Sequence, residues 1–189
     1  MNILGISGSP KKSGFTNLLL DEALDGARAG GARTRKIILN DLVFRPCQEC
    51  DGCKKTGICV YGDDMKDVYE KLIEADALIV ATPVYFGTVT AQLKTMIDRC
   101  QSVWVSKYVL NKSTEGKRER KGALICVAGK DNEDYFENVK KIVKIFYATV
   151  DTKYSGDLFV GGLNEMTENS PKRKEAILRS YDMGLSLSK

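Results

Sequence analysis

Residues 2–16 read NILGISGSPKKSGFT, and this segment gives the clearest indication of the fold class. A short apolar run at residues 2–6 ends in the turn-forming letters SGSP. An apolar pattern with helical spacing follows over residues 16–28, until Gly30 and Gly31 interrupt it. The pattern predicts a buried strand, a tight polar loop and a helix in succession. That succession is the first half of a βαβ unit, from which parallel sheets are built.

The same alternation continues along the rest of the chain. Further strands are predicted at residues 34–39, 77–82, 122–128 and 152–160. Further helices are predicted at residues 63–74, 88–99, 133–147 and 171–187. Continuously apolar strands that alternate with helices are typical of a parallel sheet covered on both faces. We therefore expect an α/β fold with a doubly wound, five-stranded parallel sheet, formed by residues 1–189 as a single domain.

The composition excludes several classes of protein. With 29 basic and 25 acidic residues the net charge is +4, too small an excess to indicate nucleic-acid binding by itself. The absence of histidine excludes mechanisms that need an imidazole base, a histidine metal ligand or a Ser-His-Asp triad. No apolar stretch approaches the roughly 18 residues of a membrane span, and no signal-peptide pattern opens the sequence. We expect a cytoplasmic protein without a membrane or nucleic-acid partner, whose cysteines are not structural disulfides.

The loop after the first predicted strand, residues 7–16, combines hydroxyl side chains with two lysines. Ligands of open α/β sheets bind beyond the carboxyl ends of the strands, where a helix N-terminus presents unpaired N–H groups. Together with Ser9, Lys11 and Thr16, such a terminus suits a phosphate monoester. The loop lacks the G-K-[ST] ending of a P-loop and also lacks G-x-G-x-x-G, which argues against NTP hydrolysis and dinucleotide binding. The alternative is an ordinary polar turn with a helix cap.

The cysteines form a compact motif in residues 44–62, where the strand–helix alternation is interrupted. Four of the six lie at C-x₂-C-x₂-C-x₅-C spacing: Cys47, Cys50, Cys53 and Cys59. Three closely spaced thiols and a fourth after a return of the chain suit the corners of one [4Fe–4S] cube. Structural zinc sites more often pair two separated knuckles, and unliganded thiols are a third interpretation. Cys100 and Cys126 lie in apolar surroundings and are expected to be core thiols.

The loop after the third predicted strand, residues 82–88, reads TPVYFGT. Its position places it beside the phosphate-type loop at the carboxyl edge of the sheet. Tyr85 and Phe86 offer apolar edges, and the N–H groups of Phe86 and Gly87 could bond the pyrimidine side of a flavin. Core packing is the alternative for an aromatic loop considered alone.

Residues 107–121 hold six basic and two acidic side chains, so their net charge of +4 equals that of the whole chain. A block of charge is most simply a solvated loop. The other interpretation is a docking surface for an acidic electron carrier, and it would use Lys117, Arg118 and Arg120.

These segments together resemble the iron–sulfur flavoproteins, within the NADPH-dependent FMN reductase and flavodoxin-like superfamily. The resemblance rests on residues 5–16, 47–65 and 81–99, and the cysteine motif is its specific part. It implies a flavodoxin-like fold with sheet order 2-1-3-4-5, FMN, and one [4Fe–4S] cluster per subunit. It also implies a homodimer or dimer of dimers, a ferredoxin-like electron donor, and reduction of oxygen or peroxide.

The resemblance also implies which residues bind the cofactors, and it assigns no catalytic side chain. The FMN phosphate would be held by Ser9, Lys11, Gly14, Phe15 and Thr16. The ring would be bordered by Pro83, Val84, Tyr85, Phe86, Gly87, Ala128 and Gly129. Members of the family commonly have Arg where Lys11 stands and Ser-Asn where Gly14 and Phe15 stand, so the phosphate contacts are expected to be rearranged.

Three functions are consistent with the sequence. The first is electron transfer between the cluster and FMN. The second is an NAD(P)H-dependent flavin reductase without a functional cluster, and the third is a cluster-bearing sensor or scaffold. Because the loops after the first three strands should leave one edge of a parallel sheet, we expect both cofactors on one face of the molecule. The resemblance favours an electron path that crosses between subunits.

Overall fold

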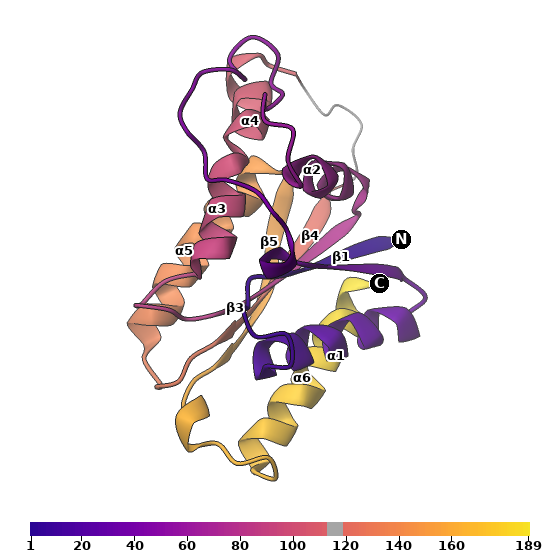
Figure 1. The fold of residues 1–189 in the computed structure, drawn as a ribbon. Helices are drawn as coiled ribbons and strands as arrows, with labels where there is room; N and C mark the ends of the chain where they lie inside the picture. The colour runs from indigo at the N-terminus through magenta and orange to yellow at the C-terminus, as the bar shows by residue number, and fades with distance from the viewer. Residues whose placement is uncertain (113–118) are drawn as a thin grey trace.

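The computed structural model describes residues 1–112 and 119–189, and its centre is a five-stranded sheet (Figure 1). The strands are β1 (Asn2–Ser7), β2 (Arg33–Ile38), β3 (Ala77–Pro83), β4 (Arg120–Val127) and β5 (Thr152–Val160). All neighbouring pairs are parallel, and the order is β2-β1-β3-β4-β5. The predicted α/β fold, the parallel sheet and the order implied by the resemblance are all confirmed.

Within the described residues, six α-helices connect or follow the strands. They are α1 (Phe15–Ala29), α2 (Met65–Glu74), α3 (Ala91–Arg99), α4 (Gln101–Trp104), α5 (Glu133–Thr149) and α6 (Pro171–Leu187). Short 3₁₀ turns lie at η1 (Leu39–Asp41) and η3 (Leu163–Glu165). Among the described helices, none is both long enough and apolar enough to cross a membrane.

The third helix ends at Arg99, as predicted, but it begins later than predicted and is followed by further helical structure. It begins at Ala91, three residues later than expected, because the side chain of Thr90 caps it by accepting a hydrogen bond from the Leu93 N–H group at 3.4 Å. Beyond Arg99 the chain stays helical through α4 and the π-helical turn η2 (Val105–Val109). No helix was predicted for this extension, which forms part of a cavity wall.

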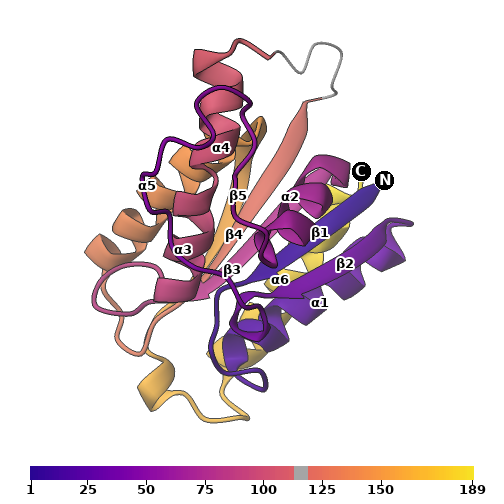
Figure 2. The ribbon, with the colours of Figure 1, turned by 45° about the horizontal axis from the view of Figure 1, so that its top comes forward.

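Helices cover both faces of the sheet, as Figures 1 and 2 show: α2, α3 and α5 lie on one face, and α1 and α6 on the other. Two apolar clusters result. Leu78 and Val80 of β3 belong to the first cluster, and Ile79 belongs to the second. The strand is therefore buried on both sides, which explains why it reads as a continuous apolar run instead of an alternating one.

Small residues allow α1 and α6 to pack closely. A Cβ atom on Gly184 would come within 1.7 Å of the Ala23 carbonyl oxygen, and one on Gly26 within 2.0 Å of the Tyr181 carbonyl oxygen. The buried hydroxyl of Ser180 donates a 2.6 Å hydrogen bond to the Leu19 carbonyl. Glycine is thus required at the crossing because the two backbones approach too closely for any side chain.

The buried Arg120 at the start of β4 stabilises the amino-terminal edge of the sheet. Its guanidinium donates to the Leu72 carbonyl at 2.6 Å and the Ala75 carbonyl at 3.2 Å. It also donates to the Val150 carbonyl and, at 3.4 Å, to the Asp151 carbonyl. Burial lowers the pKa of this group.

Arg120 therefore cannot serve the docking surface considered from the sequence, and that part of the interpretation is wrong. The guanidinium is inside the protein because backbone carbonyls at the ends of two helices need donors. Lys117 and Arg118, the other two residues of that interpretation, lie outside the residues that the structure describes.

Candidate flavin and cluster sites

The loop between β1 and α1 is attached to the neighbouring elements. The Gly8 N–H group donates to the Ala81 carbonyl at 2.8 Å, and the Ser9 hydroxyl accepts from the Lys11 N–H group at 3.2 Å. Ser9 and Thr16 are both buried. The loop is therefore a defined surface at the carboxyl edge of the sheet, where an open α/β fold binds its ligand.

The N-terminus of α1 is open toward an anion. Gly14 occupies the N-cap position and supplies no side chain, and the first turn holds no acidic residue. The N–H groups of Phe15 and Thr16 find no partner among the described residues. These unpaired donors and the positive end of the helix dipole suit a phosphate group, whereas the side-chain cap of the alternative interpretation is not formed.

Two residues near this loop were missed by the sequence analysis. Asn17 is buried; its amide nitrogen donates to the Lys11 carbonyl at 3.0 Å, and its Oδ1 atom finds no partner in the part of the chain described. The guanidinium of Arg173, from the first turn of α6, lies 4.3 Å from the centre of the Phe15 ring. An unpaired buried acceptor and a nearby cation both fit a ligand that carries hydroxyl and phosphate groups. Only Asn17, a polar residue in the apolar stripe of a predicted helix, left a signal in the sequence.

The loop after β3 forms a tight turn from Tyr85 to Thr88. The N–H and carbonyl groups of these two residues bond each other at 2.9 and 3.0 Å. Phe86 and Gly87 between them have φ values of 49° and 74°, the positive angles of a type I′ turn. The side chain of Phe86 is fully exposed and that of Tyr85 is 48% exposed. Core packing, the alternative for this aromatic loop, is therefore wrong.

The remaining predicted flavin residues lie at the same edge. Ala128 donates from its N–H group to the Val160 carbonyl at 2.8 Å, and Gly129 accepts from the Asn164 N–H group at 3.2 Å. The structure thus brings the loops after β1, β3 and β4 to one edge of the sheet. These loops and the element ends next to them hold all twelve positions assigned to FMN from the sequence: Ser9, Lys11, Gly14, Phe15, Thr16, Pro83, Val84, Tyr85, Phe86, Gly87, Ala128 and Gly129.

The cysteine loop follows a different path from the one expected. It leaves the carboxyl end of β2 near α3, where Gln92 donates to the Asn40 side chain at 3.0 Å. It then runs to the far end of α3, where the Arg45 carbonyl accepts from Arg99 at 2.9 Å. Figures 1 and 2 show it beside α4, at the opposite end of the molecule from the start of α1. The expectation that both cofactors share one face is therefore wrong, because the loop is long enough to run the whole length of α3.

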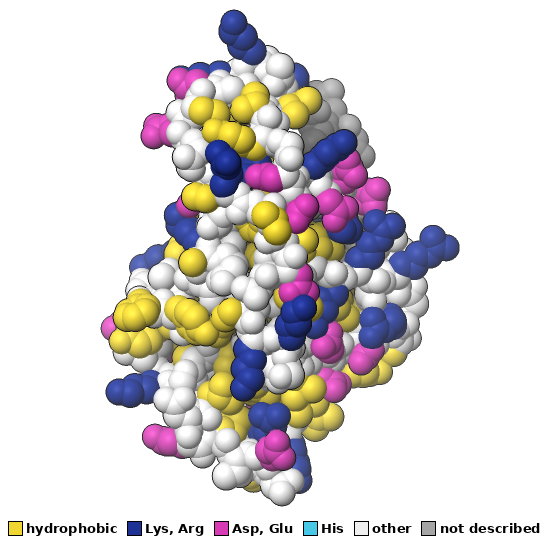
Figure 3. Space-filling model, in the orientation of Figure 1, with side chains coloured by type: hydrophobic (Ala, Val, Ile, Leu, Met, Phe, Trp, Pro, Cys, Tyr) yellow, Lys and Arg dark blue, Asp and Glu magenta, His cyan; other side chains and the backbone are white. Residues whose placement is uncertain are grey.

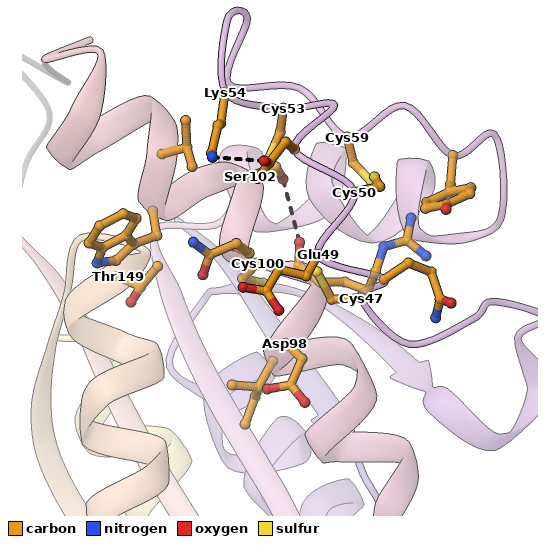
Figure 4. A pocket seen from close by; sticks show the side chains of 18 of the residues that line it. Cys47, Glu49, Cys50, Cys53, Lys54, Cys59, Asp98, Cys100, Ser102 and Thr149 are labelled. Carbon is orange, nitrogen blue, oxygen red and sulfur yellow. Dashed lines mark hydrogen bonds and ion pairs between the residues drawn. The ribbon is translucent and has the colours of Figure 1, made fainter.

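The four cysteines of the motif line one cavity of about 700 Å³ between the loop and helices α3, α4 and α5 (Figure 4). Cys47 and Cys50 are exposed, whereas Cys53 and Cys59 are partly buried. Burial, together with the other three thiols, raises the pKa of Cys53. Within the ranges the structure covers, no three cysteine or carboxylate side chains converge closely enough to form a ready metal site. The donor set fits a thiolate-bound cluster, and the side chains would have to converge when it binds.

A buried ion pair fixes the base of this loop. Both oxygens of the Asp63 carboxylate accept from Arg99, at 2.6 and 2.9 Å. The Asp63 carboxylate also accepts from the Met65 N–H group at the start of α2, at 3.2 Å. Burial opposes ionisation of Asp63, but the Arg99 guanidinium outweighs it and lowers the pKa of the carboxyl group. The sequence analysis missed both residues, although Arg99 follows Leu93 and Met96 at helical spacing on the buried face of α3.

Cys100 and Cys126 are confirmed as core thiols. Both are at most 2% exposed. Burial raises the pKa of each thiol to about 12, so neither is a ready thiolate. Cys100 nevertheless lines the cavity of the cysteine loop.

Apolar side chains are exposed around the cysteine loop. They come from the loop, from the extension beyond α3 and from α5: Ile58, Val60, Trp104, Tyr108, Val109 and Ile145. Figure 3 shows hydrophobic side chains gathered at this end of the molecule. A group of exposed apolar side chains is typical of a surface that another protein covers.

Comparison with known proteins agrees with this geometry. Residues 1–130 match the family described as NADPH-dependent FMN reductase. An iron–sulfur flavoprotein of Methanocaldococcus jannaschii is 42% identical over 112 residues, which are 59% of this chain and only 58% of that protein. An iron–sulfur flavoprotein of Archaeoglobus fulgidus is 32% identical over 188 residues, which span 97% of this chain and 83% of that protein.

A solved structure shows the same fold. The NAD(P)H:quinone oxidoreductase from Methanothermobacter marburgensis superposes with a TM-score of 0.75 at 22% identity, over the whole of this chain and 96% of that one. The chain therefore belongs to the NADPH-dependent FMN reductase family and, within it, to the iron–sulfur flavoproteins, with the flavodoxin-like fold of FMN-dependent oxidoreductases.

Proposed function

We propose that this protein passes electrons between a [4Fe–4S] cluster in the cysteine loop and FMN at the carboxyl edge of the sheet. The observation that carries the proposal is the single cavity lined by four thiols: Cys47, Cys50, Cys53 and Cys59. Because a flavin exchanges one or two electrons, it can couple a one-electron cluster to a two-electron acceptor. No histidine is needed for such a reaction.

The chain's own contribution would be to bind and orient the two groups. The open N-terminus of α1, with Thr16 and the nearby Arg173, would hold the phosphate. The N–H groups of Phe86 and Gly87, which project from the turn after β3, would hold the polar edge of the ring. The exposed Phe86 side chain would shield an apolar edge of the ring from water.

The two sites are separated by the length of α3. A helix of nine residues rises about 14 Å at 1.5 Å per residue, and the sites lie beyond its two ends. The exposed apolar side chains around the cysteine loop would be covered by a second copy of the chain, in a homodimer or dimer of dimers. The cluster would then receive electrons from a ferredoxin-like donor, and FMN bound to the partner subunit would pass them to oxygen or peroxide.

A plain NAD(P)H-dependent flavin reductase is the second candidate. It is favoured by the family that residues 1–130 match, and by the lack, among the described residues, of three ligands already gathered for a metal. In this case the cysteines would carry no functional cluster, and NAD(P)H would reduce the flavin directly.

The deciding experiment is anaerobic purification followed by a visible spectrum and by iron and sulfide analysis. About four irons per chain, the content of one cube, together with a flavin band, supports the proposal. Cys59→Ala should lose the iron but keep FMN, whereas the matched variant Cys126→Ala, in the core of β4, should keep both. Flavin without iron in the wild-type protein, rapidly reduced by NADPH, would establish the second candidate instead.

A further inference from the structure

Arg99 is the most deeply buried cation near the cysteine loop, with a side chain only 1% exposed. Of the four N–H groups on its two terminal nitrogens, three are paired in the structure. Nη1 donates to Asp63 at 2.6 Å and to the Arg45 carbonyl at 2.9 Å, and Nη2 donates to Asp63 at 2.9 Å. Its Nε atom is also buried but has no hydrogen-bond partner among the described residues.

An unpaired N–H group in this position needs an explanation. Nearly all buried donors in proteins are paired, and leaving one unpaired costs free energy. The same guanidinium is held on its face by the ring of Tyr61, whose centre lies 5.5 Å away, so it cannot easily turn to find another partner. The orientation of Arg99 is thus determined by its neighbours, and Nε is the guanidinium nitrogen that makes no hydrogen bond to any described residue.

The free donor belongs to a residue that lines the cavity of the four cysteines. Cys59 lines the same cavity. In the cavity, the acceptors that cluster binding would add are sulfur atoms, which are the thiolates and the sulfides of the cube. A sulfur acceptor at this place would pair the buried Nε–H group, which no described residue does.

We infer that Arg99 positions the cluster and tunes its potential, with Nε–H donating to a cluster sulfur, either the Cys59 thiolate or a sulfide. This inference rests on the proposed function, because it requires the cluster. A hydrogen bond to sulfur and a fixed positive charge both favour the reduced, more negative cluster. Arg99 should therefore raise the reduction potential of the cluster.

A simpler role for Arg99 is to anchor the loop through Asp63 alone. The two roles predict different results for Arg99→Lys. Lysine keeps the positive charge and can still pair with Asp63, but it has no guanidinium and therefore no Nε–H donor. Arg45→Lys is the matched control. The Arg45 guanidinium also lies against Tyr61, 5.1 Å from the centre of its ring, but Arg45 is exposed.

The experiment compares the wild-type protein and both variants after anaerobic purification, by iron content and by redox titration of the cluster. Arg99→Lys should keep its iron and show a midpoint potential shifted to a more negative value, whereas Arg45→Lys should match the wild type. If Arg99→Lys keeps both its iron and the wild-type potential, Arg99 is an anchor only and the inference is wrong.

A second measurement uses the wild-type protein and does not depend on whether Arg99→Lys folds. The wild-type protein is prepared with ¹⁵N-labelled arginine and reduced, and pulsed electron paramagnetic resonance is used to detect a nitrogen coupled to the paramagnetic cluster. The inference expects such a coupling, unchanged in Arg45→Lys. A reduced cluster without nitrogen coupling would overturn the inference alone, while wild-type protein without iron would overturn the proposed function and the inference with it.

Discussion

The hydroxyl of Thr90 donates a 2.7 Å hydrogen bond to the carbonyl of Gly8, so the N-cap residue of α3 is joined to the loop between β1 and α1. Thr90 caps α3, and Gly8 opens the loop proposed to hold the FMN phosphate. At the other end of the same helix, Arg99 holds the base of the cysteine loop through Asp63. A single helix of nine residues therefore connects the two proposed cofactor sites.

Replacing Thr90 with Ala should weaken both stability and FMN binding. The change removes a helix cap and leaves the Gly8 carbonyl without its donor, which together should lower the free energy of unfolding by about 1–3 kcal/mol. Urea denaturation and FMN titration would measure the two effects. Ser170→Ala is the control, since it removes the cap of α6 and should lower stability without the same loss of FMN affinity. Equal FMN affinity in both variants would contradict the coupling.

Replacing Thr16 with Ala should weaken FMN binding by about 1–2 kcal/mol, the range for losing a donor to a charged acceptor. Thr16 is buried at the open start of α1, whereas Ser13 in the same loop is exposed. Ser13→Ala should therefore bind FMN as the wild type does. Fluorescence titration of the apoprotein measures both. If Thr16→Ala also has wild-type affinity, the phosphate lies elsewhere.

Phe86 has a left-handed backbone conformation, which the turn requires but which is unfavourable for a bulky side chain. At a φ value of 49°, asparagine is tolerated better than a bulky residue. Phe86→Asn should leave the apoprotein as stable as before or up to about 1 kcal/mol more stable, while FMN binding weakens because an aromatic contact is lost. Thermal unfolding of the apoprotein and FMN titration separate these effects.

Gly87→Ala in the same turn is expected to lower the stability of the apoprotein, in contrast to Phe86→Asn. Its φ value of 74° is unfavourable for alanine, and the new Cβ atom would lie 3.2 Å from the Tyr135 ring. This variant should lose about 1 kcal/mol of stability. If Phe86→Asn is destabilised as much as Gly87→Ala, the exposed Phe86 side chain contributes to folding and not to flavin binding.

The Asp63–Arg99 ion pair should make stability depend on pH in the acid range. The pKa of Asp63 is lowered in the folded protein, so the stabilisation is complete above the unfolded value of about 3.9 and is lost as the pH falls through the lower, folded value. Asp63→Asn cannot titrate at this position. The difference in free energy of unfolding between wild type and variant should therefore shrink from pH 6 to pH 3.

Both proteins are best compared in a Cys59→Ala background, which removes any cluster from the measurement. Urea midpoints at several pH values give the difference directly. A difference that stays constant over this range would show that the ion pair does not titrate as its geometry implies.

The hydroxyl of Tyr147, a residue of α5, bonds to both β3 and β4. It donates to the Ala123 carbonyl of β4 at 2.6 Å and accepts from the Val80 N–H group of β3 at 3.2 Å. Because the residue is fully buried, Tyr147→Phe removes both hydrogen bonds from the protein interior and should cost about 1–3 kcal/mol of stability. Tyr135→Phe, at a residue 39% exposed, is the control and should be nearly neutral. Equal unfolding midpoints would contradict the bridging role.

The local elements of this protein could be predicted from the sequence alone. Each strand–helix pair follows from apolar periodicity over neighbouring residues, as in residues 77–82, which are apolar on both faces because helices cover both. The cysteine motif is local in the same sense, since the spacing from Cys47 to Cys59 by itself limits what the thiols can bind. The order of the strands came from the resemblance to a family and not from periodicity.

The path of the cysteine loop, and the residues that hold it, depend on contacts between distant segments and could not be predicted. A loop of this length can reach either edge of the sheet, and its path depends on Asp63 meeting Arg99, a residue 36 positions away. Arg173 likewise reaches Phe15 because α1 and α6 pack against each other through glycines. Such pairs leave no periodic signal, because the free energy that selects them arises only when distant segments are buried together and their polar groups must find partners.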